Sequence, residues 1–159
     1  MALRYLLDTN ICIYIAKNRP DSVLKRFRQL SVGEVAMSAI THGELCYGAC
    51  KSRRREDAQK ALRELGTMIP VLPISSQVGD RYGEIRSELE HAGRLIGNND
   101  LWIAAHALAL GVALVTNNSR EFARVTGLVV ENWVERSDPS QVHEAKRKHG
   151  IGKSSRQSA

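Results

Sequence analysis

Short apolar segments alternate with amphipathic segments along most of the chain. Apolar runs typical of buried strands occur at 3–7, 34–38, 70–74, 112–116 and 128–132. Segments with helical periodicity lie between and beside them, at 10–18, 22–30, 39–51, 55–65, 77–93, 99–111 and 119–125. Strands separated by helices predict a mostly parallel sheet covered by helices on both faces. We therefore expect the α/β class, as a three-layer α/β/α sandwich.

The ends of these elements carry recognisable signals. Asn10 is the expected N-cap of the first helix, and Ser38 is the expected N-cap of the helix at 39–51. Gly93 and Gly111 are expected to stop the two long helices that precede them. The strand at 70–74 contains two prolines, which cannot donate to a ladder, so it is expected at an edge of the sheet.

Length and charge indicate one folded domain with a polyanionic partner. The chain has 159 residues, of which 43% are hydrophobic, and carries a formal net charge of +6. A basic surface favours binding to nucleic acid. From residue 137 onward large apolar residues are scarce and basic residues outnumber acidic ones. We expect a domain over 1–136 and a basic polar tail over 137–159 that cannot fold alone. This tail either is simply solvated or adds affinity for nucleic acid.

The cysteines and the N-terminus indicate a cytoplasmic protein. The cysteines are three in number, an odd count without framework spacing: Cys12, Cys46 and Cys50. This argues against a disulfide scaffold and for a reducing compartment. The apolar run before Asp8 is too short for a signal peptide, and no stretch approaches the length of a transmembrane helix. No membrane association is expected.

Asp8 stands directly behind the first predicted strand, in the segment RYLLDTNICIYI. In open α/β sheets, ligands bind beyond the carboxyl ends of the strands. Asp8 can therefore be a functional carboxylate at that edge, or an ordinary cap of the helix that follows.

Two further acids occupy comparable places. Glu44 lies in the first half of a helix that is otherwise small or apolar, and Asp100 lies in the first turn of an almost wholly apolar helix. Each has a structural explanation: Glu44 can lie on a solvated face, and Asp100 can complement the helix dipole. Three acids near one end of the sheet are harder to explain by capping alone.

Carboxylates gathered at one edge repel one another and raise each other's pKa. A divalent cation removes that penalty, and Mg²⁺ or Mn²⁺ prefers oxygen ligands and retains several waters. Such an ion activates water and stabilises a phosphoryl transition state. We therefore expect Asp8, Glu44 and Asp100 to lie close enough to share one ion, with a nucleic-acid backbone as the substrate.

Several segments together resemble the PIN domain of VapC-type toxins. They are LLDTNICIYI, SAITHGELCYGA, YGEIRSELEHAGRLIGNNDLWIAAHAL and LVTNNSREFARVTGLVVENW, in that order along the chain. The resemblance implies a magnesium-dependent endoribonuclease, with Mn²⁺ as a substitute. It would be the toxin of a type II toxin–antitoxin pair that cleaves structured RNA such as tRNA and inhibits translation. It also implies a VapB-type antitoxin and a homodimer as partners.

The resemblance assigns roles to individual residues. Asp8, Glu44 and Asp100 match the family's catalytic acids; Asp8 and Asp100 would be the principal metal ligands. Glu44 would bind the metal directly or through water, or orient the attacking water. A fourth acid often follows the VT strand, and the nearest position here is the neutral Asn118.

Three further polar residues lie near the predicted acids. Glu121 is acidic but is expected one turn into the next helix. Thr9 and Thr116 can donate hydrogen bonds to the carboxylates or to phosphate, or can be ordinary polar turn residues.

Apolar side chains near the acids give modest support for a homodimer. Ile11, Ile15, Leu45 and Tyr47 exceed what one core face needs, although each can also belong to the core.

Other functional classes fit the sequence less well. A phosphatase of the haloacid-dehalogenase type needs a second Asp where this chain has Asn10, and a dinucleotide-binding fold needs a glycine-rich turn after the first strand. A non-catalytic nucleic-acid-binding or regulatory module on the same fold is the alternative. It predicts a broken carboxylate set, whereas Asp8, Glu44 and Asp100 are all present. Such a module would show no stabilisation by magnesium.

Overall fold

A parallel sheet forms the centre of the protein. The computed structural model describes residues 2–134, and its strands follow the order β3-β2-β1-β4-β5, with every neighbouring pair parallel. The strands are β1 (Tyr5–Leu7), β2 (Val35–Ser38), β3 (Val71–Leu72), β4 (Ala113–Val115) and β5 (Val130–Glu131). The predicted fold class is confirmed, and the proline-flanked strand lies at the edge as expected.

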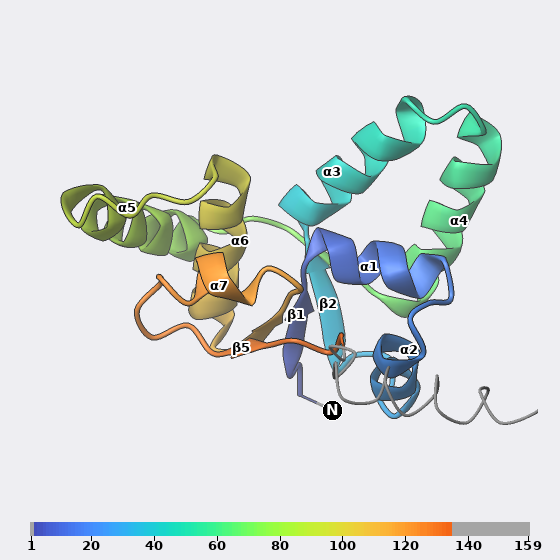
Figure 1. Ribbon diagram of the computed structural model, residues 1–159, viewed down its shortest axis with the longest axis horizontal. Coiled ribbons are helices and arrows are strands. Elements are labelled where there is room, and N and C mark those ends of the chain that lie inside the picture. Colours follow the sequence, from blue (N-terminus) through green and yellow to red (C-terminus); the bar gives the residue numbers. More distant parts are fainter. Residues whose placement is uncertain (1, 135–159) are drawn as a thin grey trace, which may run out of the picture.

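Helices cover both faces of the sheet (Figure 1). They are α1 (Thr9–Ala16), α2 (Asp21–Arg28), α3 (Ala39–Cys50), α4 (Arg55–Met68), α5 (Ser76–His91), α6 (Asn98–Leu110) and α7 (Ser119–Phe122). The segment predicted at 119–125 forms only this short helix. None of the helices in the described range is both long and apolar enough to cross a membrane.

The alternation of side chains along β1 creates two separate cores. Leu6 packs with the buried residues of α5 and α6 on one face of the sheet. Tyr5 and Leu7 point to the other face, where they pack with α1, α2 and α4. All three residues of β1 are buried, so Asp8 directly follows a strand that is covered on both faces.

The ends of the helices correct one expectation and confirm others. Asp8, rather than Asn10, is the N-cap of α1, and its side chain accepts a hydrogen bond from the Thr9 amide. Ser38 caps α3 as expected. The chain adopts positive φ at Gly93 (+63°) and Gly111 (+67°), which end the two long helices.

The cysteines lie within the described residues, whereas the predicted tail does not. All three cysteines are free thiols, so no disulfide links them. The predicted tail over 137–159, and with it the domain boundary at residue 136, lies outside the described residues.

Candidate active site

Asp8 is a buried carboxylate held by hydrogen bonds from two directions. Only 6% of the residue is exposed. Its Oδ1 accepts a bond of 2.7 Å from the Thr9 amide, and its Oδ2 accepts a bond of 2.7 Å from the Thr116 hydroxyl at the end of β4. Asp8 is therefore both the cap of α1 and a fixed carboxylate at the carboxyl edge of the sheet, so the two readings of this residue are compatible.

Burial raises the pKa of Asp8 above its ordinary value, while the hydrogen bonds from Thr116 and Thr9 lower it and so oppose the shift. The two hydrogen bonds favour the ionised form that a cation would bind. The Thr116 hydroxyl therefore donates to a carboxylate in this structure.

Glu44 faces the same region from α3. The hydroxyl of Thr9 donates to Glu44 Oε1 at 3.1 Å, so Thr9 links Asp8 through its amide to Glu44 through its side chain. Burial raises the pKa of Glu44, the bond from Thr9 lowers it, and the charge of Asp8 raises it. Glu44 is therefore not on a solvated face directed away from the other acids.

The start of α3 is anchored in the core, which fixes the position of Glu44. The Ser38 hydroxyl accepts a bond of 3.2 Å from the Ile40 amide and lies 2.9 Å from Nδ1 of His106, a buried residue of α6. The first turn of α3 is thus tied both to its own cap and to the helix that carries Asp100.

Asp100 completes the predicted set from the first turn of α6. Burial, followed by the charges of Asp8, Glu121 and Glu44, raises its pKa to about 6. A side chain at Gly97 would place its Cβ 3.4 Å from Asp100 Oδ2, so the glycine leaves room for this carboxyl group. Because the charges of Asp8 and Glu44 both act on Asp100, and that of Asp8 also acts on Glu44, the three acids belong to one electrostatic cluster.

Glu121 is a fourth acid of this cluster, which the sequence interpretation set aside in favour of Asn118. Besides its charge, a hydrogen bond with Glu121 raises the pKa of Asp100. The Asn118 amide group donates to Glu121 Oε2 at 2.8 Å, and the Asn118 backbone amide donates to the Thr116 hydroxyl at 2.9 Å. Asn118 therefore holds the side chain of Glu121 by a hydrogen bond, and the carboxyl group that acts on Asp100 belongs to Glu121. The spacing of three residues between Asn118 and Glu121 is compatible with this contact but did not by itself indicate that Glu121 joins the site.

The cluster fits a hard cation in its chemistry, but it is not a complete cage. In the described part of the chain, no group of three or more His, Cys, Asp or Glu side chains is arranged so that it could hold a metal ion. The expectation that three carboxyl groups stand close enough to share one ion is therefore not met. Magnesium, however, needs only one or two carboxylates and fills its shell with water and substrate oxygens. Asp8 and Asp100 would be such ligands, and a cation would compensate the charges of Asp8, Glu121 and Glu44 that help to raise the pKa of Asp100.

Comparisons with known proteins agree with this fold. Residues 5–128 match the PIN domain family. The chain is 45% identical over 132 residues to ribonuclease VapC2 of Haemophilus influenzae, with 83% of this chain and 99% of the relative covered. It is 44% identical over 131 residues to the tRNA(fMet)-specific endonuclease VapC of Shigella flexneri, with 82% and 98% covered.

A solved structure gives the same result. The crystal structure of VapBC2 from Rickettsia felis, bound to a DNA fragment from its promoter, is similar with a TM-score of 0.77 and 40% sequence identity. The match covers 83% of this chain and 100% of the other. The chain therefore belongs to the PIN domain family and, within it, to the VapC-type toxins.

Proposed function

We propose that this protein is a magnesium-dependent endoribonuclease, the toxin of a type II toxin–antitoxin pair. The observation that carries the proposal is the cluster of Asp8, Glu44, Asp100 and Glu121 at the carboxyl edge of the sheet, in which the charges of the other three acids help to raise the pKa of Asp100 and the charge of Asp8 also raises that of Glu44. Relatives that are 43–45% identical are named ribonucleases, which supports the same chemistry here.

The roles proposed for the side chains follow from their contacts. Asp8 and Asp100 would hold Mg²⁺ or Mn²⁺, which when bound lowers the pKa of water and neutralises charge on phosphoryl oxygens. Thr116 and Thr9 fix the two oxygens of Asp8. Glu44, whose pKa is raised by burial, is suited to orient the attacking water or to accept its proton.

Structured RNA, and tRNA in particular, is the proposed substrate. The net charge of +6 favours a polyanion, and the relative from Shigella flexneri is named a tRNA(fMet)-specific endonuclease. Cleavage of tRNA would inhibit translation. Because this substrate is found in the cytoplasm, we propose that the protein acts there.

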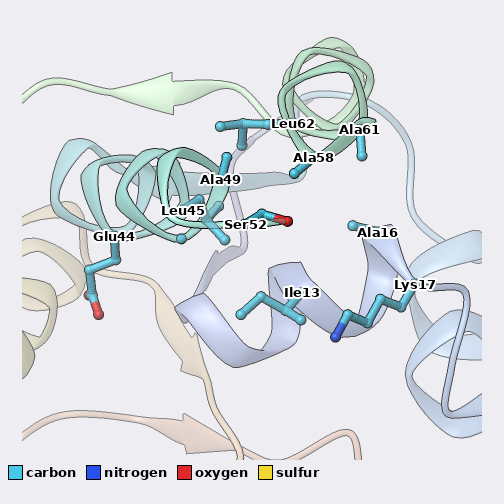
Figure 2. Close-up of a pocket in the computed structure, with 11 residues that line it drawn as sticks. Ile13, Ala16, Lys17, Glu44, Leu45, Ala49, Ser52, Ala58, Ala61 and Leu62 are labelled. Carbon is cyan, nitrogen blue, oxygen red and sulfur yellow. The ribbon is translucent and has the colours of Figure 1, made fainter. Parts of the chain in front are cut away.

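A VapB-type antitoxin is the proposed protein partner, because similar solved structures from Rickettsia felis and Haemophilus influenzae are VapBC complexes. A pocket of about 360 Å³ between α1, α3 and α4 offers an apolar surface for it (Figure 2). Glu44 lies at one end of this pocket and Lys17 at the other, with Ile13, Leu45 and Leu62 between them. An apolar antitoxin segment seated there could bring a basic side chain to the acids.

Of the four apolar residues expected to support a homodimer, two are not exposed. Ile11 and Ile15 belong to the core, because α1 packs against the sheet and α2. Leu45 is half-buried, and only Tyr47, 67% exposed, is the kind of surface residue that was expected. The homodimer stays a proposal, and light scattering that finds only monomer at micromolar concentration would contradict it.

The proposed function is tested by incubating the protein with total cellular RNA and Mg²⁺ and mapping the new 5′ ends. New ends at defined positions, absent when EDTA replaces Mg²⁺, are expected. The alternative, a non-catalytic nucleic-acid-binding module, predicts no new ends and no stabilisation of the fold when Mg²⁺ is titrated.

A further inference from the structure

The hairpin of α3 and α4 projects away from the sheet (Figure 1), and the turn between the two helices is rich in lysine and arginine. We use the term basic tip for its exposed cations, which are Lys51, Arg53, Arg54 and Arg55. None of them forms an ion pair within the described residues. Lys51 Nζ lies 4.7 Å from the centroid of the Tyr47 ring, and Arg55 Nη2 donates weakly to Cys50 Sγ at 3.8 Å. The guanidinium groups are therefore available to a ligand from solvent.

The arginines occupy positions that helix electrostatics disfavours. Arg54 is the N-cap of α4 without a side-chain capping bond, and Arg55 is its first residue. The N-terminus of a helix carries partial positive charge, so cations there are unfavourable, whereas Glu56 and Asp57 in the first turn are favourable. Four cations still outnumber these two acids at the turn. Residues that destabilise a helix end in this way are expected where a function requires them.

The distance between the basic tip and the acidic cluster follows from helix α3, which connects them. Glu44 belongs to α3, and Lys51 follows the last residue of that helix. The rise of ~1.5 Å per helical residue places the tip roughly 10 Å further along the helix axis. Because neighbouring phosphates of an RNA strand are several ångströms apart, one strand can contact both places within a few nucleotides.

We propose that the basic tip is a docking site for the phosphate backbone of the RNA substrate, a few nucleotides from the cleaved bond. This inference rests on the proposed function. Arginine suits the task, because its planar fork pairs with two phosphate oxygens at once. The Tyr47 ring, 67% exposed, stands beside Lys51 and offers a surface on which a base can stack.

The test compares two triple variants of the full chain that remove equal charge. The tip variant carries Arg53→Gln, Arg54→Gln and Arg55→Gln. The control carries Lys25→Gln, Arg28→Gln and Arg94→Gln, which change exposed cations on α2 and after α5. Binding of the intact RNA substrate is measured in EDTA, which prevents cleavage, over a range of salt concentrations. Cleavage of the same RNA is measured with Mg²⁺.

Loss of three phosphate contacts should reduce the slope of log affinity against log salt by about 2 for the tip variant, because each single-stranded contact contributes ~0.7. The KM of cleavage should rise on the order of 10- to 100-fold at 0.1 M salt with kcat unchanged, while the control stays near wild type. A companion variant with lysine at the three positions keeps the charges and should restore the slope.

If the tip variant folds poorly, Arg53→Gln alone decides, because Arg53 precedes α4; its slope should fall by ~0.7. Equal slopes and KM values for tip and control variants would overturn the proposal. A tip variant that loses antitoxin binding but keeps RNA binding would assign the tip to an acidic protein segment instead. Absence of RNA cleavage by the wild-type protein would refute the proposed function itself, which is a separate result.

Discussion

The Thr116 hydroxyl donates a 2.7 Å hydrogen bond to Oδ2 of Asp8, joining residues 108 positions apart in the sequence. The contact exists because β1 and β4 are parallel neighbours, and each residue directly follows its strand. The same hydroxyl accepts the Asn118 amide, so one buried side chain fixes both the first acid and the turn that leads to Glu121.

Replacing Thr116 with valine should therefore damage both the fold and the site. Thr116→Val leaves Asp8 Oδ2 and the Asn118 amide without a partner, which should cost about 1–3 kcal/mol of unfolding free energy. The pKa of Asp8 should rise further, because the bond that lowers it is gone. Urea unfolding and Mg²⁺ titration measure the two effects. Thr116→Ser keeps the hydroxyl and is the control; a valine variant indistinguishable from it would refute this role.

The raised pKa of Asp100 predicts a pH dependence of stability in the absence of metal. Its folded-state pKa of about 6 exceeds its ordinary value of 3.8, so the folded protein holds this proton more tightly than the unfolded chain. The resulting stability is fully present below pH 3.8 and is lost as the pH rises through about 6. Asp100→Asn cannot ionise, so it should lose less stability over this range and be the more stable protein at pH 7.5.

Unfolding free energies of the wild-type protein and Asp100→Asn, measured in EDTA from pH 4.5 to 7.5, test this difference. Asp8 and Glu44 also have raised pKa values, so the variant should retain part of the slope. If the unfolding free energies of the two proteins change with pH in parallel, the pKa of Asp100 is not raised in the folded protein.

Much of the site was predictable from the chain, because an acid placed directly behind a buried strand must lie at one edge of a parallel sheet. Asp8 follows this rule. Glu121 does not, because its position depends on how the short helix α7 turns after Asn118. The exposure of Ile11 and Tyr47 was equally hard to predict, because both are apolar residues on helices. Ile11 faces α2 and the sheet, whereas Tyr47 faces solvent.

Asn118→Asp tests how this residue relates to the site. The change replaces a donor, 2.8 Å from Glu121 Oε2, with another carboxylate. Without metal the added repulsion should destabilise the fold, and with metal the extra charge should tighten Mg²⁺ binding. Thermal unfolding over a Mg²⁺ titration measures both, with Asn118→Ala as the uncharged control. Unchanged metal affinity in the aspartate variant would remove Asn118 from the site.

Antitoxin and metal should compete for the same carboxylates. We expect that the antitoxin has a C-terminal segment that is disordered when free, and that a basic side chain of this segment approaches Asp8, Glu44 or Asp100. Magnesium should then weaken antitoxin binding by the factor by which antitoxin weakens magnesium binding, since coupling is reciprocal. Calorimetry of antitoxin binding with and without Mg²⁺ gives this factor. Identical affinities in both buffers would mean that the antitoxin inhibits by blocking access of RNA.

The most direct measurement of the central claim is the single-turnover rate at which Asp8→Asn cleaves the mapped RNA at saturating Mg²⁺. The variant keeps the size of the side chain but loses the charge that would bind the cation. The rate should fall at least ~100-fold, because the metal's stabilisation of the transition state is lost. Folding should persist, and stability in EDTA should be equal or higher as carboxylate repulsion falls. A folded variant that cleaves the RNA at the wild-type rate would contradict the account.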